Sequence, residues 1–290
     1  MRGILNFVSD GRHDFGQGLV TYASSKLAFK SRLQAFQYRI CTVADSFRVA
    51  DDMGKLRCQF KVFHRPIFGF KGSYVVTRLG AERRVSFDNG EEGSIAEDCF
   101  FAMLAMDSMS DGGGDDESKT TTTQKRRRHT FDFIEGEMLE KSPFWFYEFF
   151  KQRERWMKGI TMVVLSERIS WRTKGLLAMS TAAWLTLPVS TLNLYLSQRF
   201  PFSLGVALDF GLGFLGATGL LSYGYGYLKQ HQVRRYSWPR LLLVVPEIVL
   251  STALSIVVEN CAVFAMWFGR WDQVNGYLPR YTLCNTLNNL

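Results

Sequence analysis

The stretches SIAEDCFF (residues 94–101) and QRERWMKG (residues 152–159) decide how this chain is interpreted. The first places an acidic pair at the start of a predicted helix, and the second places the pattern Q-x-x-R-W on another predicted helix. Because positions i, i+3 and i+4 share one face of a helix, Gln152, Arg155 and Trp156 bring an amide, a guanidinium and an indole side by side. Such a face can hold a charged, flat ligand.

The two acids of the first stretch have different expected roles. Ser94 and Glu97 form the pattern S-x-x-E ahead of an apolar run, which is typical of a capping box. Glu97 is therefore expected to reach back and cap the helix, a structural task. Asp98 projects from the first turn, where the positive end of the helix dipole favours its ionised form. Two solvated acids at a helix start are the alternative that spacing alone leaves open.

Four longer strings narrow the interpretation: VADDMGKLR (49–57), KGSYVV (71–76), VSFDNG (85–90) and FIEGEM (133–138). With the acidic pair and Q-x-x-R-W, they make the chain resemble the membrane-bound family 2 glycosyltransferases. Within that family it resembles the egghead-type β-1,4-mannosyltransferases. The resemblance runs from about residue 1 to about residue 268, apart from one insert. It implies a GT-A-like nucleotide-diphospho-sugar transferase domain.

The resemblance also implies roles for individual residues. Asp98 would be the general base that takes the proton from the acceptor hydroxyl in one inverting displacement. Gln152 and Arg155 would bind the donor diphosphate or its sugar, because a guanidinium matches a phosphate bidentately. Trp156 would form the floor of the acceptor site. A basic amphipathic helix lying on the membrane explains the cations of this segment equally well.

The segment Phe68–Ser73 combines aromatic residues with glycines beside a predicted strand. Glycine lets a backbone approach a ligand closely, so Lys71 and Gly72 are candidate acceptor-binding residues. An ordinary tight turn is the alternative.

By resemblance, the substrates are GDP-mannose and a glucosylceramide-type glycolipid acceptor, in glycosphingolipid biosynthesis at an endoplasmic reticulum or Golgi membrane. A divalent cation, Mg²⁺ or Mn²⁺, would offset the charge of the leaving diphosphate. In the family, the ligands of this cation and a nucleotide-binding βαβ region come earlier in the sequence than the segment that resembles residues 2–8. We therefore expect no metal ligands in this chain and an amino-terminally truncated domain. A processive polysaccharide synthase and a catalytically inactive truncated membrane protein are the alternatives.

Composition is consistent with a globular domain joined to a membrane region. The chain has 290 residues, a net charge of +8 and five cysteines, an odd number without a C-x-x-C pair, so neither a disulfide framework nor a zinc site is predicted. The basic excess lies in an insert and beside apolar segments without any nucleic-acid motif, so membrane lipids rather than nucleic acid are the expected partners. Oligomeric state is left open.

The carboxylate clusters and histidines offer no predicted metal site. Asp51-Asp52 is expected to be solvated or structural, and the acids of residues 111–117 lie among glycines that leave them without fixed geometry. The histidines, at positions 13, 64, 129 and 231, share no metal-ligand spacing.

The predicted fold class is α/β plus membrane α, in four parts. Residues 1–106 form the acceptor-side half of the catalytic domain, with strands at 18–22, 60–63 and 73–79. Residues 107–129 form a disordered polar insert, whose basic run 125–128 is a solvated charge run, a nuclear-import signal or a lipid-binding patch. Residues 130–174 complete the domain, with a helix starting at Ser142-Pro143. Residues 175–290 hold three membrane helices and a lumenal tail.

The three apolar segments lie at about 175–197, 204–228 and 241–268, each long enough to cross a bilayer. The strongly basic segment 229–240 is expected in the cytosol by the positive-inside rule, which also puts the catalytic part there. Pro188 is expected to kink the first span, and GLGFLG (211–216) to serve helix packing rather than nucleotide binding. Asp209, Glu247 and Glu259 are carboxylates inside these segments, either protonated or snorkelling, or lining a lipid-acceptor groove.

Overall fold

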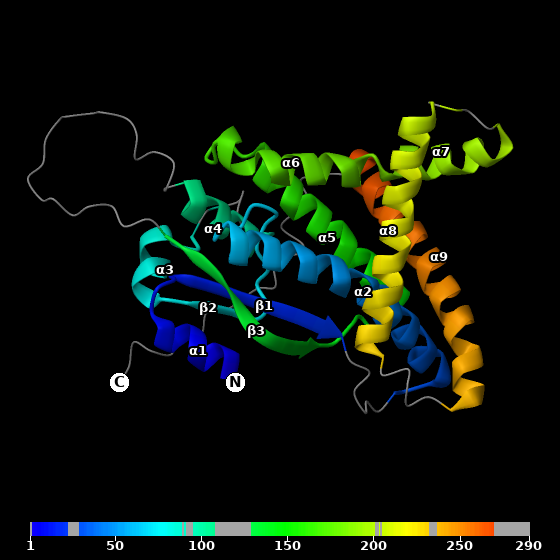
Figure 1. Ribbon diagram of the computed structural model, residues 1–290, viewed down its shortest axis with the longest axis horizontal. Helices are drawn as coiled ribbons and strands as arrows, with labels where there is room; N and C mark the ends of the chain where they lie inside the picture. The colour runs from blue at the N-terminus through cyan, green and yellow to red at the C-terminus, as the bar shows by residue number, and fades with distance from the viewer. Residues whose placement is uncertain are drawn as a thin grey trace, which may run out of the picture.

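The computed structural model describes residues 2–22, 29–88, 90, 95–107, 129–200, 203, 205–231 and 237–269. They form a small mixed sheet covered by helices, followed by long apolar helices (Figure 1). This agrees with the predicted α/β fold plus membrane helices.

The sheet has three strands, β1 (Phe15–Tyr22), β2 (Val75–Thr77) and β3 (Phe131–Glu140), in the order β2-β1-β3. Central strand β1 is buried along its whole length, antiparallel to β2 and parallel to β3. A bulge between Gly18 and Leu19 shifts the register against β3. Gly18 also admits the ring of Tyr74, since a Cβ there would lie 2.1 Å from that ring.

Helices cover both faces of this sheet (Figure 1). Helix α1 (Arg2–Asp10) lies on one face, where Phe7 packs against Gly16. On the other face lie α2 (Arg32–Arg57) and α4 (Glu97–Asp107), and Phe15 of β1 meets Phe101 of α4 edge to face. The short helix α3 (Leu79–Val85) follows β2. The core between the sheet and these helices is largely aromatic.

Residues 60–63 do not form the predicted strand. Residues 60–62 belong to a π-helical turn, η1 (Cys58–Val62), that directly continues α2, and Phe63 is its C-cap. The amide of Cys58 still donates to Gly54 and Lys55 of α2, and no turn residue interrupts the chain there. The long helix α2 was also missed, because several of its faces are buried and its apolar residues show no single stripe. Ser31 caps it by accepting from the Gln34 amide at 3.1 Å.

Helix α5 (Phe146–Leu165) begins later than the predicted start at Ser142-Pro143. Ser142 is buried and does not cap the helix. The free amides are satisfied by one side chain of the first turn of α5 and by one distant side chain instead. The Phe144 amide donates to Glu148 at 2.9 Å, and the Phe146 amide donates to Gln37 of α2 at 3.1 Å.

The carboxyl-terminal helices are α6 (Trp171–Leu185), α7 (Leu187–Arg199), α8 (Val206–Gln230) and α9 (Trp238–Phe268). Among the described residues, α8 and α9 are each long and apolar enough to cross a membrane. The predicted first span is broken into two helices, α6 and α7, which are bent by 50° at the break. If this bent pair is taken as a single span, it is a third candidate membrane crossing. The break lies next to Pro188, as the predicted kink requires.

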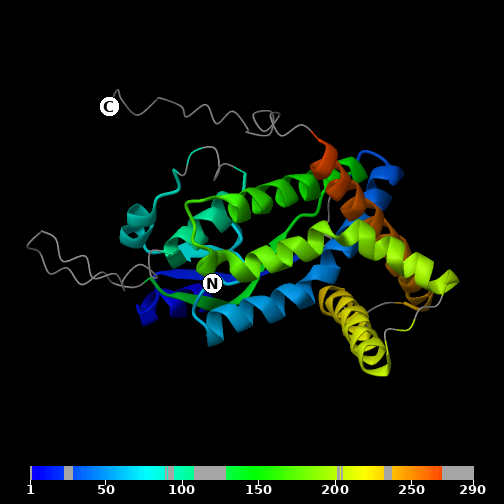
Figure 2. The same cartoon turned by 90° about the horizontal axis from the view of Figure 1, so that it is seen from above.

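Helices α8 and α9 lie at the end of the domain away from α1 and α3, as both views show (Figures 1 and 2). Most of the predicted insert lies outside the described residues. Its two end residues are described: Asp107 ends α4 and accepts hydrogen bonds from Ser170 and Thr173 at the start of α6, and His129 pairs with Asp14 at 3.1 Å.

Candidate functional site

Asp98 lies in the first turn of α4, half-buried. Its carboxylate accepts a hydrogen bond from the Cys99 amide at 2.7 Å. Burial nevertheless raises the pKa of Asp98 above its ordinary value, and the backbone amides of Cys99 and Gly72 offset only part of that rise. The amides at the helix start thus favour the ionised form, as expected, while desolvation acts in the opposite direction and is the larger influence. A carboxylate with a raised pKa is a stronger base.

Gly72 lies directly against Asp98. A Cβ on Gly72 would be 3.3 Å from Asp98 Oδ2, so the absence of a side chain keeps this carboxylate oxygen clear. The structure thus brings together the predicted acceptor loop and the predicted base. Glu97 is exposed in the same turn, and its predicted capping partner Ser94 lies outside the described residues.

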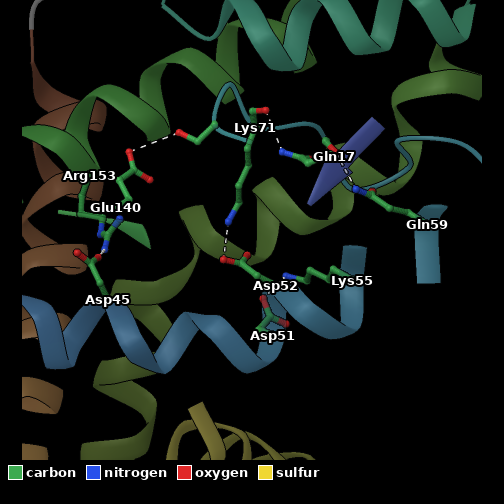
Figure 3. Close-up of polar contacts among 11 residues, drawn as sticks. Gln17, Asp45, Asp51, Asp52, Lys55, Gln59, Lys71, Glu140 and Arg153 are labelled. Atoms are coloured by element: carbon green, nitrogen blue, oxygen red, sulfur yellow. Dashed lines mark hydrogen bonds and ion pairs between the residues drawn. The ribbon is translucent and has the colours of Figure 1, made fainter. Parts of the chain in front are cut away.

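Lys71 is held through both its main chain and its side chain, as Figure 3 shows. Its carbonyl accepts from Gln17 Nε2 of β1 at 2.8 Å, and its ammonium pairs with Asp52 of α2. Burial lowers the pKa of Lys71. The pKa of Asp52 also lies below its ordinary value, because the positive charges of Lys71 and Arg48 together outweigh the rise that burial alone would cause. The interpretation of the Asp51-Asp52 pair as solvated or structural is confirmed, since Asp51 pairs with Lys55 at the surface, at 2.7 Å.

Gln152 and Arg155 of α5 line a hollow of about 420 Å³ together with the preceding segment Lys141–Phe144, Glu148 and Lys151. Arg155 is exposed, whereas Gln152 Oε1 is buried without a hydrogen-bond partner among the described residues. The lining has three cationic side chains and one carboxylate. Such a balance suits an anionic ligand with a free hydroxyl or amide donor for Gln152.

Trp156 is half-buried and is not among the residues that line this hollow. Two guanidinium groups lie over its ring, Arg48 of α2 at 4.8 Å and Arg153 at 4.4 Å from the centroid. The predicted common face is therefore divided between two environments. Gln152 and Arg155 face the hollow, and Trp156 contacts the cations between α2 and α5.

The sequence interpretation missed a buried ionic network that positions Trp156. Arg153 is 1% exposed and forms ion pairs with Asp45 of α2 and with Glu259 of α9, the latter at 3.3 Å. Glu259 also accepts from the Trp184 indole at 2.6 Å. The signal was present in part, because Asp45, Arg48 and Asp52 recur on one helical face. Their partners are distant in sequence, so spacing alone does not pair them.

The two deciding stretches pack against each other. Gly159 of α5, three residues after Trp156, faces Ile95 and Ala96 at the start of α4, and a Cβ there would lie 2.8 Å from that of Ala96. The close approach of α5 to the start of α4 places the Q-x-x-R-W helix beside the turn that carries Asp98.

The other acids and histidines of the sequence interpretation are placed as follows. Glu247 pairs with Arg39 and Arg240, each at 2.7 Å, and Asp209 accepts from Ser203 at 2.6 Å. The acids of residues 111–117 lie outside the described residues. Although the histidines share no metal-ligand spacing in sequence, the fold brings His13 and His64 together with Asp132. Linear spacing does not reveal such a cluster, because its members come from three segments.

Residues 1–268 match the family model described as "Glycosyl transferase family group 2". The chain is 46% identical over 272 residues to the "Beta-1,4-mannosyltransferase bre-3" of Caenorhabditis elegans and of Caenorhabditis briggsae. It is 45% identical over 263 residues to the "Beta-1,4-mannosyltransferase egh" of Drosophila melanogaster. These alignments cover 93% and 91% of this chain but 54% and 51% of the relatives, so the chain spans about half the length of the curated relatives it matches. No solved structure matches it. The chain belongs to glycosyl transferase family group 2.

Proposed function

We propose that this chain is the acceptor-side part of a membrane-bound β-1,4-mannosyltransferase. It would transfer mannose from GDP-mannose to a glucosylceramide-type glycolipid, with inversion at the anomeric carbon, in glycosphingolipid biosynthesis. The observation that carries the proposal is the contact between Asp98 and Gly72 beside the helix of Gln152, Arg155 and Trp156. The sugar and the linkage come from the names of the relatives, which are β-1,4-mannosyltransferases.

Asp98 acts as the general base in this proposal. The acceptor hydroxyl approaches over Gly72, donates its proton to the Asp98 carboxylate, and its oxygen attacks the anomeric carbon as the diphosphate leaves. The raised pKa of Asp98 favours this proton transfer. The absence of a side chain at Gly72 leaves the approach to Asp98 Oδ2 open on that side.

Gln152 and Arg155 are the proposed ligands of the donor diphosphate. Arg155 supplies a fork of N–H donors to phosphate oxygens, and the cationic lining of the hollow adds to that attraction. Trp156 is the proposed acceptor platform. The guanidinium groups of Arg48, at 4.8 Å, and of Arg153, at 4.4 Å, lie over its ring and hold its orientation, and the half-buried indole would offer its remaining accessible surface to a pyranose.

The proposed reaction uses a divalent cation, Mg²⁺ or Mn²⁺, but the hollow at Gln152 and Arg155 does not supply ligands for it. Both ions prefer several oxygen ligands, and the hollow offers one carboxylate, Glu148, which already accepts from the Phe144 amide. The described residues therefore do not fit the ion. We propose that its ligands lie in the part of the relatives' length that this chain does not span.

The catalytic part is proposed to face the cytosol at an endoplasmic reticulum or Golgi membrane. The end of α8 touches the sheet domain, because Lys229 pairs with Glu137 at 2.8 Å and Gln230 accepts from the Tyr22 amide at 3.0 Å. The end of α8 at which the basic segment 229–240 begins therefore lies beside the domain. By the positive-inside rule this end of α8 and the domain are cytosolic. The bent pair of α6 and α7 then crosses the membrane once, so that α8 begins on the lumenal side and ends on the cytosolic side.

The proposal is tested with a chimera in which residues 1–268 replace the matching half of the Drosophila relative. The purified chimera is given GDP-mannose and glucosylceramide in membranes, and the glycolipid is analysed by mass spectrometry. We expect one added hexose in β-1,4 linkage. A polymer would favour a processive synthase, and a folded but inactive chimera would favour a non-catalytic protein. The same chimera carrying Asp98→Asn is the negative control.

Gly72→Ala is expected to lower kcat of the chimera about tenfold, because the new methyl group would crowd Asp98 Oδ2, at 3.3 Å, and misplace the carboxylate relative to the acceptor. Gly54→Ala is the matched control. Gly54 lies exposed in α2 with no atom within 4 Å of its Cβ position, so alanine there should leave kcat unchanged and stabilise the helix by about 0.5–1 kcal/mol. Equal kcat values for the two variants would refute the proposed role of Gly72.

A further inference from the structure

Three potential metal ligands from separate segments meet at the edge of the sheet domain. His13 precedes β1, His64 follows η1, and Asp132 is the second residue of β3. One ligand atom of each lies within 4.8 Å of the others. The two imidazole rings are nearly parallel, with centroids 5.1 Å apart.

The backbone fixes which nitrogen of His64 is free. Nδ1 of His64 lies 3.2 Å from the carbonyl oxygen of Phe131, which can only accept, so Nδ1 carries the proton. The Nε2 lone pair is then available to a metal, as in protein sites where a carbonyl orients a ligating histidine. The Phe131 amide also donates to the His64 carbonyl at 3.2 Å. His64 is held in the left-handed region, at φ 51°, by these contacts.

His13 contributes a second free nitrogen. Its Nδ1 is buried and has no hydrogen-bond partner among the described residues. A buried polar atom without a partner costs free energy. A bound cation would satisfy it.

We propose that His13, His64 and Asp132 bind one zinc ion, which would join the start of β1, the end of η1 and the start of β3. Two imidazoles and one carboxylate are a zinc donor set with a fourth position for water. Around tetrahedral zinc the ligand atoms lie about 3.4 Å apart, so small side-chain rotations from the observed 4.8 Å would close the site. Lys61, partly exposed and 3.7 Å from Asp132, would swing aside.

This site is separate from the cation proposed for the donor diphosphate. Mg²⁺ prefers oxygen ligands, whereas imidazole favours zinc and its neighbours in the transition series. None of the three residues lines the hollow at Gln152 and Arg155. The inference does not depend on the proposed function, and its test needs no transfer assay.

Zinc binding is measured on the full chain, purified in detergent with a tag that contains no histidine and stripped with EDTA. Zinc is titrated against a chromogenic chelator, and cobalt is titrated while its visible absorption is recorded. We expect one zinc per chain, a Kd below about 1 μM, the strong visible bands of tetrahedral cobalt, and a rise in Tm of about 5 °C at saturating zinc.

His64→Gln and Asp132→Asn are each expected to weaken zinc binding at least tenfold and to abolish the cobalt bands. Glu135→Gln is the matched control, because Glu135 lies on the same strand and faces the same Lys61, at 3.9 Å. It should bind zinc as the unchanged chain does. Metal-free Tm values within about 2 °C of the unchanged chain show that each variant is folded. Absence of stoichiometric zinc, or equal affinity in all variants, overturns the proposal.

Discussion

Asp98→Asn is expected to lower mannosyl transfer by about 10²–10⁴-fold, because an amide cannot accept the proton of the acceptor hydroxyl. The same change should not destabilise the chain at neutral pH. Burial raises the folded-state pKa of Asp98 above its unfolded value. The stabilisation from its bound proton is therefore present at low pH and lost as pH rises through the raised pKa. Asparagine, which never ionises, avoids that loss.

The transfer rate of the chimera and the Tm of the chain, both measured between pH 4 and pH 8, check this result. Glu97→Gln is the matched control, since Glu97 lies in the same turn but is exposed. We expect it to retain most of the activity. The activity with Asp98 intact should fall as pH falls through the raised pKa of its carboxyl, because only the carboxylate is a base. Full activity of Asp98→Asn would show that the base is another group.

Arg153→Met is expected to lower the free energy of unfolding by about 3–5 kcal/mol, the cost of leaving buried carboxylates without their cation. Arg153 is 1% exposed, and its removal strands Asp45 of α2, itself 1% exposed, and Glu259 of α9. It also removes the guanidinium that lies 4.4 Å from the Trp156 ring centroid. Urea denaturation of the chain in detergent measures the effect.

Arg155→Met is the matched control for Arg153, because it removes the same charge from the same helix at an exposed position. Its free energy of unfolding should change by less than about 0.5 kcal/mol, whereas donor binding should weaken. Adding Asp45→Asn to Arg153→Met should restore part of the lost stability, since one stranded charge is then removed. Equal destabilisation by the two arginine variants would contradict the buried network.

The parts of the site that could be predicted from sequence depend on local geometry. An acidic pair ahead of an apolar run fixed the start of α4, and helical spacing placed Gln152 and Arg155 together at one hollow. The kink near Pro188 is also local, because proline cannot continue the hydrogen bonding of a helix. Such features need only neighbours along the chain.

The features that were missed depend on contacts between distant segments. The start of α5 is set by Gln37 of α2 rather than by Ser142, and residues 60–62 continue α2 as η1, with Phe60 buried in the aromatic core. The pairing of Arg153 with Asp45 joins residues far apart in sequence. Burial also adds an influence on the pKa of Asp98 that opposes the amides of the helix start. Neither pairing nor burial can be read from spacing in one sequence.

The most direct measurement is the mass of the glycolipid formed when the chimera with intact Asp98 is given GDP-mannose and glucosylceramide. The proposed function predicts a product heavier by a single hexose, formed by the chimera and not by its Asp98→Asn variant. An unchanged glycolipid from a folded chimera, or a product with many added sugars, would contradict it.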